Sequence, residues 1–219
     1  MSPRPPLRIA VLVSGSGSNL QAIIDAIAAG SLDARIVGVI SDRPGVRALE
    51  RATAAGIPAI TVDYHAMADR DAFGTALLGE LQGLEPQLVV LAGFMRILPA
   101  GLVESYRGRM LNVHPSLLPL YPGLHTYRRA LEAGDAWHGT TVHFVTPELD
   151  AGPAIIQYRV RIRPADTEDS LRERVQRGEH HVYPLAIQWL ASGRVAFRDG
   201  IVWREGRPAT GPETIDEKE

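Results

Sequence analysis

The 219-residue chain carries 25 acidic and 23 basic residues, a formal net charge of −2, and it contains no cysteine. A near-neutral chain without a basic cluster is poorly suited to a nucleic-acid backbone, so small molecules are the expected ligands. The lack of cysteine excludes disulfides, thiolate metal ligands and thiol nucleophiles. No apolar run is long enough to cross a bilayer, and residues 1–6 lack the apolar core of a signal peptide. We therefore expect a cytoplasmic protein without a membrane or nucleic-acid partner.

The first half of the chain alternates short β-branched runs with amphipathic stretches, a pattern typical of parallel strands joined by helices. The expected strands are Leu7–Val13, Arg35–Ile40, Ala59–Val62 and Gln87–Ala92. The expected helices are Leu20–Ala29, Val46–Ala55 and Asp69–Leu84. This half is typical of a nucleotide-binding α/β fold.

The second half begins with a short helix near Pro99, and proline then excludes regular structure for several residues after position 114. The further strands expected are Met110–Val113, Gly139–Thr146 and Ala154–Arg163, followed by a helix over 168–190 and a hairpin over 194–204 that turns at Asp199-Gly200. No repeat or linker marks a boundary. We expect one domain over residues 1–219, with loose segments at 1–6 and from about 205 to 219.

A glycine-rich loop, Ser14–Asn19, joins the first strand to the first helix, so its backbone amides can face a phosphate. A dinucleotide fingerprint needs a third glycine where Leu20 stands, although Asp42 after the second strand resembles a ribose-binding acid. The alternative is a tight turn capped by Ser18 or Asn19 without any ligand. The loop alone does not decide between these interpretations.

Asn112 and His114 end an apolar strand, and the alternation of a strand places both side chains on one face. Ligands bind at this end of parallel strands in open α/β sheets. Asp150, in a polar turn, reaches His114 only through the fold. There its carboxylate would orient the imidazole and favour the protonated ring, which could donate a proton to a substrate oxygen or stabilise an oxyanion. Asn112 would be a neutral donor to that same substrate oxygen. Taken singly, each residue also fits a structural role as a cap, a buried histidine or a turn residue.

Histidines are frequent in this part of the chain, but their spacing is poor evidence for zinc and no HExxH pair occurs. The four in question are His114, His125, His138 and His143. We expect no metal.

Five segments together resemble the phosphoribosylglycinamide formyltransferases, folate-dependent enzymes of purine biosynthesis, and the resemblance extends from Leu7 to Trp203. They are SGSGSNLQAI at 14–23, LAGFMRIL at 91–98, LNVHPSLLPLYPGLHTYRRALEAGD at 111–135, HGTTVHFVTPELDAGP at 138–153 and QRGEHHVYP at 176–184. The resemblance implies a Rossmann-like formyltransferase fold, with a mostly parallel seven-stranded sheet and helices on both faces. It also implies 10-formyltetrahydrofolate as a cosubstrate.

The resemblance assigns roles residue by residue. The positions that match catalytic residues are Asn112, His114 and Asp150. Those that match ribonucleotide-binding positions are Gly17, Ser18, Asn19 and Glu179. Those that match folate-binding positions are Arg70, Met95, Arg96, Ile97, Leu98, Asn112, Thr146, Pro147, Glu148, Leu149 and Asp150. Thr141 and His143 match supporting polar positions; Thr141 replaces a serine, and Leu120 stands where some relatives have a basic residue.

The function expected from the resemblance is transfer of the formyl group to the amino group of glycinamide ribonucleotide. A formyltetrahydrofolate hydrolase shares the Asn-x-His and Asp elements, but we expect an additional N-terminal domain there. A methionyl-tRNA formyltransferase would add a basic C-terminal domain. A dinucleotide-binding oxidoreductase or a nucleotide sensor would explain the glycine loop and Asp42 but not residues 111–153. A homodimer is compatible with such a sheet, although no motif predicts one.

Overall fold

The computed structural model describes residues 5–218, and these divide into two compact units, the first ending at Leu111 and the second beginning at Asn112. Residues 1–4 and 219, which belong to the segments expected to be loose, lie outside the described residues. One domain over the whole chain stays a prediction. Among residues 5–218, no helix combines the length and apolarity needed to cross a membrane.

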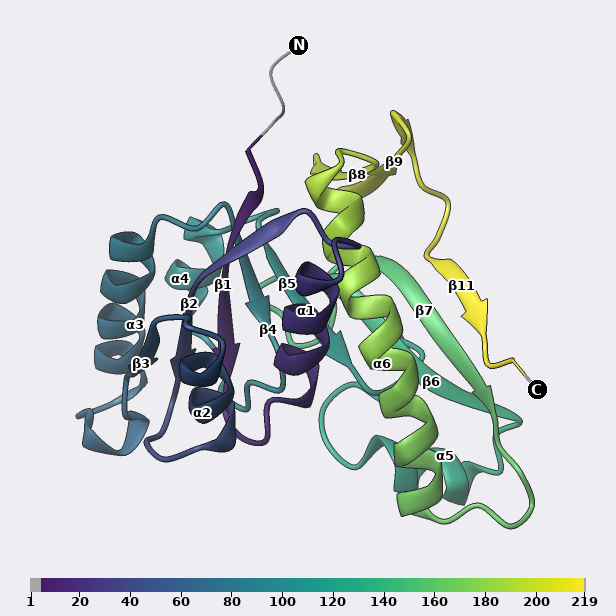
Figure 1. Ribbon diagram of the computed structural model, residues 1–219. Coiled ribbons are helices and arrows are strands. Elements are labelled where there is room, and N and C mark those ends of the chain that lie inside the picture. Colours follow the sequence, from purple (N-terminus) through teal and green to yellow (C-terminus); the bar gives the residue numbers. More distant parts are fainter. Residues whose placement is uncertain (1–4, 219) are drawn as a thin grey trace. The chain divides into compact units, whose positions relative to one another are not determined.

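The first unit is a parallel sheet with its crossover helices. Its elements are β1 (Leu7–Val13), α1 (Ser18–Ala28), β2 (Ala34–Ser41), α2 (Arg47–Ala54), β3 (Ala59–Thr61), the 3-10 turn η1 (Tyr64–Ala66), α3 (Arg70–Leu84), β4 (Leu88–Leu91) and α4 (Ala100–Ser105). The strands lie in the order β4-β1-β2-β3. Because crossovers are right-handed, α1 and α2 cover one face, while α3, which returns the chain to β4, covers the other (Figure 1).

The central strand of the first unit is β1, which pairs in parallel with β2 on one side and with β4 on the other. Its residues Ile9–Val13 are completely buried, as expected of a strand covered on both faces. The chain leaves β1 toward β2 and later returns to its other side, so the strand order reverses there. Open α/β sheets bind ligands at such a point, beyond the carboxyl ends of the strands.

The second unit contains strands of both directions and one long helix. Its elements are β5 (Met110–His114), which enters from the first unit, α5 (Thr126–Ala133), β6 (Trp137–Phe144), β7 (Ala154–Arg161), α6 (Glu168–Ala191), β8 (Val195–Arg198), β9 (Ile201–Arg204), β10 (Arg207–Pro208) and β11 (Glu213–Asp216). The order is β11-β7-β6-β5, with β6 and β7 antiparallel and β11 parallel to β7. Strands β8 to β10 form a separate antiparallel sheet.

The long helix α6 packs against β7 through an apolar cluster that includes Val160, Leu171 and Val175. Its first turn is closed by a capping box, in which the Thr167 hydroxyl accepts from the Ser170 amide and the Ser170 hydroxyl accepts from the Thr167 amide. A defined start and a buried stripe hold the helix on this sheet.

Most expected elements are confirmed to within a few residues, including the hairpin that turns at Asp199-Gly200. Helix α5 was not expected; it begins four residues after Pro122, where the proline restriction has ended. The expected loose tail is wrong for β10 and β11. The expected count of seven strands is also wrong, because the main sheet has eight strands. The additional strand is β11.

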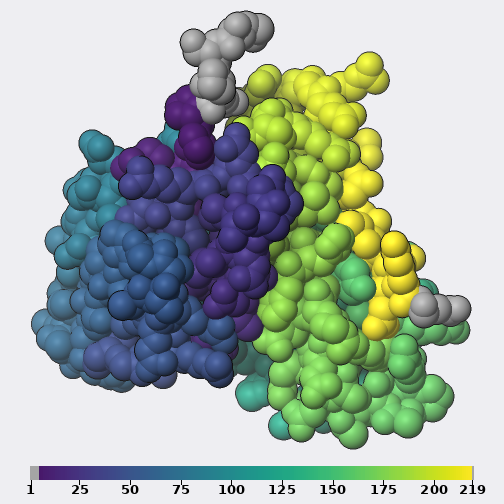
Figure 2. All heavy atoms as spheres, viewed as in Figure 1, coloured from purple at the N-terminus to yellow at the C-terminus, as the bar shows by residue number. Residues whose placement is uncertain are grey.

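The additional strand β11 is held by ion pairs and has little apolar pattern of its own. Arg159 of β7 binds both carboxylate oxygens of Asp216, at 2.8 and 3.0 Å, and the buried Arg174 binds Glu217 at 2.9 Å. Figure 2 shows this C-terminal segment, in yellow, on the surface of the second unit. Its partners lie 43 to 57 positions earlier in the chain, so a local pattern does not reveal it.

Candidate active site

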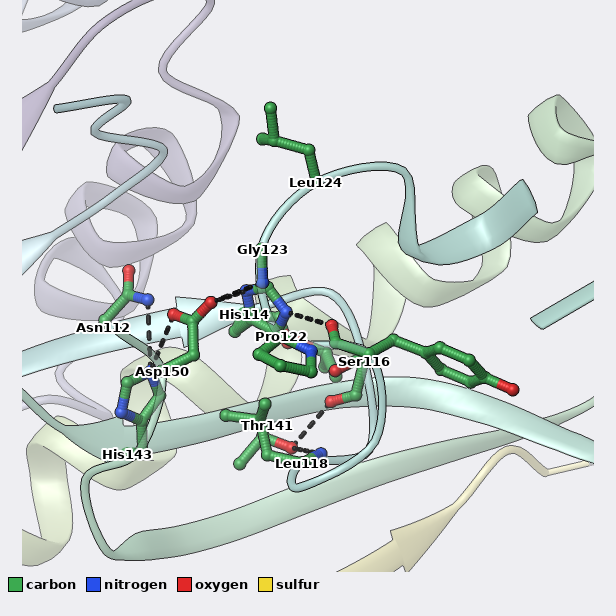
Figure 3. A network of polar contacts seen from close by, with 12 residues as sticks. Asn112, His114, Ser116, Leu118, Pro122, Gly123, Leu124, Thr141, His143 and Asp150 are labelled. Carbon is green, nitrogen blue, oxygen red and sulfur yellow. Dashed lines mark hydrogen bonds and ion pairs between the residues drawn. The ribbon is translucent and has the colours of Figure 1, made fainter. Parts of the chain in front are cut away.

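The contact between His114 and Asp150 that the sequence left open is present. His114 ends β5, and Asp150 lies in the turn between β6 and β7. His114 Nδ1 lies 3.4 Å from Asp150 Oδ2, and the two side chains are only 8% and 7% exposed. Figure 3 shows Asn112 and His114 on the side of β5 where Asp150 lies. The three residues proposed for catalysis therefore form one cluster in the second unit.

Both ring nitrogens of His114 face hydrogen-bond acceptors. Nε2 lies 2.9 Å from the Tyr121 carbonyl oxygen, and Nδ1 faces the Asp150 carboxylate. A carbonyl oxygen only accepts, and an ionised carboxylate only accepts. Only a ring that carries a proton on both nitrogens can donate to both acceptors, so the geometry suits an imidazolium. The His114 ring and the Asp150 carboxylate lie in a site that excludes most water.

The position of Asp150 follows from a tight turn. Its backbone is left-handed, with φ of 52°, and its Oδ2 also accepts from the Gly123 amide at 2.9 Å. A Cβ on Gly152 would lie 1.7 Å from the Phe144 carbonyl oxygen, so glycine is required for this close approach. The turn thus aims the carboxylate at His114 without freedom to swing away.

A second histidine, His143 on β6, orients Asn112. Its Nδ1 donates to the Phe144 carbonyl at 2.9 Å. Burial lowers the pKa of His143 to about 4, only partly offset by that hydrogen bond and by Asp150, so the ring is neutral near pH 7. Nε2 is then an acceptor, and it accepts from Asn112 Nδ2 at 3.1 Å. The second N–H of Asn112 remains for another acceptor.

Asp150 lies near both histidines, but His114 is the nearer one and His143 is neutral. His143 Nε2 lies 3.9 Å from Asp150 Oδ1, a longer separation than the His114 contact. Two imidazolium rings around one carboxylate would repel each other. Because burial keeps the His143 ring neutral, that ring places no positive charge beside Asp150.

Thr141 on β6 anchors the loop after β5 through two hydrogen bonds. The Thr141 hydroxyl donates to the Ser116 carbonyl at 2.7 Å and accepts from the Leu118 amide at 3.0 Å. Farther along the loop, the Tyr121 hydroxyl donates to Asp135 at 2.7 Å. Thr141 thus stabilises the loop that supplies the Tyr121 carbonyl and the Gly123 amide. These two backbone contacts were missed, because a backbone group carries no signal in the sequence.

The glycine-rich loop of the first unit presents a helix N-terminus. Gly17, and not Ser18 or Asn19, is the N-cap of α1, and no side-chain cap hydrogen bond is made there. Its φ is +71°, and a Cβ there would lie 2.7 Å from the Ala48 Cβ. No acidic residue occupies the first turn. The helix dipole at this end therefore favours an anion.

Asp42 does not have the role that a dinucleotide site requires. Its Oδ2 lies 2.6 Å from Arg96 Nε, and its side chain is completely buried. A ribose hydroxyl cannot reach a carboxylate that is buried against a guanidinium. The resemblance of Asp42 to a ribose-binding acid is therefore wrong, and the sequence missed the pair because its partners stand 54 positions apart.

The remaining residues expected to bind folate lie in both units. In the first, Arg70 begins α3 and is exposed, and the irregular residues 95–98 present Met95 and Ile97, which are 62% and 57% exposed. The amides of residues 96–98 donate no hydrogen bond within the described part of the chain. In the second unit, Thr146 is half-buried and residues 147–149 are exposed in the turn that ends at Asp150. Glu179 is a buried residue of α6.

The described residues hold no group of three or more His, Asp or Glu side chains arranged to bind a metal ion. Of the four histidines weighed as zinc ligands, His114 and His143 belong to the cluster around Asp150. His138 instead packs against the rings of Tyr121 and Tyr127, and burial lowers its pKa to about 4.

The formyl transferase family matches residues 7–187, and the chain belongs to this family. The phosphoribosylglycinamide formyltransferase of Escherichia coli (strain K12) is 49% identical over 201 residues, which are 92% of this chain and 95% of that protein.

Solved structures of related proteins are similar to this chain as well. The phosphoribosylglycinamide formyltransferase of Coxiella burnetii superimposes with a TM-score of 0.91 at 46% identity, over 95% of this chain and 99% of that one. A formyltetrahydrofolate deformylase from Pseudomonas syringae is more distant, with a TM-score of 0.84 at 26% identity over 91% of this chain and 66% of that one. The fold is thus the Rossmann-like formyltransferase fold, with a mostly parallel central sheet.

Proposed function

We propose that the protein transfers the formyl group of 10-formyltetrahydrofolate to the amino group of glycinamide ribonucleotide, in de novo purine biosynthesis. The products are N-formylglycinamide ribonucleotide and tetrahydrofolate. The observation that carries the proposal is the buried contact between His114 and Asp150, beside Asn112, in a chain similar along nearly its whole length to phosphoribosylglycinamide formyltransferases. We further propose that the reaction takes place in the cytoplasm. A homodimer stays a prediction.

The proposal assigns binding groups residue by residue. Gly17, Ser18 and Asn19 begin α1, where the helix N-terminus suits the phosphate of the ribonucleotide. Glu179 is assigned to the glycinamide end, where a carboxylate attracts the amine. The exposed Met95 and Ile97 and the free amides of residues 96–98 suit the flat heterocycle of the folate, because such sites combine apolar walls with a few polar groups.

The chemistry requires stabilisation of one negative charge. The substrate amine attacks the formyl carbon, and the carbonyl oxygen becomes an oxyanion on a tetrahedral carbon. Asn112 donates its second N–H to this oxygen, and the His114 imidazolium donates Nε2–H in place of its bond to the Tyr121 carbonyl. Asp150 keeps the ring charged and fixes its orientation.

The intermediate then releases the folate nitrogen. The C–N bond to folate breaks, the C–O double bond re-forms, and one proton moves from the attacking amine to the departing nitrogen. Either His114, whose ring can give one proton and regain another, or a water held near Asp150 carries that proton. No covalent bond to the protein forms, which agrees with a chain that has no cysteine.

A transfer assay with and without acceptor tests the proposal. Purified protein should convert 10-formyltetrahydrofolate to tetrahydrofolate only when glycinamide ribonucleotide is present, and the formylated amide should appear in equal amount. Binding of both substrates without transfer would reject the function. Equal release of tetrahydrofolate without acceptor would instead indicate hydrolysis, the activity named for the Pseudomonas syringae relative.

A further inference from the structure

A buried ion pair ties two loops of the first unit together. Asp42 directly follows β2, and Arg96 lies in the irregular stretch between β4 and α4, here termed segment 93–98. Arg96 Nε lies 2.6 Å from Asp42 Oδ2, and the Asp42 side chain is completely buried. The guanidinium also lies over the Tyr64 ring, with its central carbon 4.0 Å from the ring centroid. Arg96 is thus held by charge and by stacking.

Segment 93–98 has few other anchors. It is neither helix nor strand, and within the described residues the Met95 amide is its only backbone donor that makes a hydrogen bond, to the Ser14 hydroxyl at 2.9 Å. Ser14 directly follows β1, as Asp42 directly follows β2. Two adjacent residues of the segment are therefore tied to the ends of two adjacent strands.

Because the Arg96 side chain points inward, the side chains of its two neighbours point toward solvent. Met95 and Ile97 are exposed, whereas Leu98 is buried, so the side chains alternate along the segment. If Arg96 turned outward, Met95 and Ile97 would lose these directions. The ion pair thus maintains a short apolar wall together with the free amides of residues 96–98.

We propose that Asp42 is a positioning residue for folate binding, which acts by holding Arg96 inward and so fixing the wall formed by Met95 and Ile97. This inference rests on the proposed function. It assigns the Arg96 side chain a role inside the protein: Nε binds Asp42, Nη2 lies 3.3 Å from His65 Nε2, and one face of the guanidinium covers Tyr64. Only the backbone of Arg96 is left to contact folate.

Two variants separate positioning from direct contact. Asp42→Asn removes the charge but leaves the guanidinium, which is partly exposed and can turn to water. The double variant Asp42→Asn with Arg96→Met removes both charges and leaves no unpaired ion in the interior, so it tests the proposal even if the single variant folds poorly. Asp216→Asn is the matched control, because it breaks another carboxylate–guanidinium pair, that with Arg159 in the second unit.

The measurements are the KM for 10-formyltetrahydrofolate, the KM for glycinamide ribonucleotide, and kcat. We expect both Asp42 variants to raise the folate KM roughly 10- to 100-fold, the factor for one lost charge-assisted hydrogen bond. The ribonucleotide KM and kcat at saturation should stay near those of the wild type, and Asp216→Asn should leave all three constants unchanged.

If the Arg96 guanidinium instead bound folate directly, the two variants would differ in their folate KM. Asp42→Asn would then leave the folate KM unchanged or lower it, and only the double variant would raise it; that result overturns the proposal. An unchanged folate KM in both variants overturns it as well. Failure of the wild-type protein to transfer formyl groups would reject the proposed function instead, and that result is visible before any variant is made.

Discussion

Replacing Asp150 with asparagine tests the role of its charge while preserving its shape. Asp150 has φ of 52°, a left-handed conformation that asparagine adopts readily, so the turn should be retained. The asparagine oxygen can still accept from the Gly123 amide, as Oδ2 does at 2.9 Å. The loss is therefore confined to the negative charge that faces His114.

The size of the effect follows from the geometry. Two unit charges at the 3.4 Å separation of His114 Nδ1 and Asp150 Oδ2 attract by about 5 kcal/mol at an effective dielectric constant of about 20. In the variant His114 can become neutral, which regains part of this attraction energy. The neutral ring, however, has one N–H donor fewer. Loss of a charged donor to an oxyanion costs about 3–4 kcal/mol, so we expect kcat to fall roughly 10²- to 10³-fold.

Steady-state kinetics on both substrates measure this loss. Both KM values should change little, because the charge acts on the transition state rather than on binding. Asp199→Asn is the matched control: Asp199 has the same φ of 52° in the β8–β9 turn, so the same substitution is made at the same backbone conformation. A kcat for Asp150→Asn within threefold of the wild type would refute the reasoning.

Gly17→Ala should raise the KM for glycinamide ribonucleotide by roughly tenfold, about 1.4 kcal/mol, because its Cβ would collide with Ala48; an unchanged KM in steady-state assays would contradict this. Acidification from pH 6.5 to about 4 should reduce the free energy of unfolding by roughly 3 kcal/mol through His138 alone. Burial lowers the folded-state pKa of His138, so the unfolded chain takes up the proton first; His138→Gln should flatten the pH dependence in urea titrations, and an equal slope would exclude this cause. Ending the chain at residue 211 should lower the free energy of unfolding by about 2 kcal/mol, because the buried Arg174 keeps Asp166 but loses the charged hydrogen bond to Glu217. The same urea midpoint with and without β11 would show that the strand adds no stability.

Local patterns predicted the elements well because their causes are local. The run Leu7–Val13 is apolar except for Arg8, and it forms the central strand β1 over the same residues. Alternation along β5 placed Asn112 and His114 on one face for the same reason, since the period of two is a property of the extended backbone. By contrast, β11 has no such pattern and depends on Arg159 and Arg174.

The sequence by itself therefore determined the order of helices and strands, the glycine-rich helix start and, through its resemblance, the family. Tertiary structure decided the charges of the site. It brought Asp150 to His114, buried His143 so that this ring stays neutral, and paired Asp42 with Arg96 instead of leaving it for a ribose. These outcomes depend on burial and on contacts between distant segments, and neither is a property of any short stretch of residues.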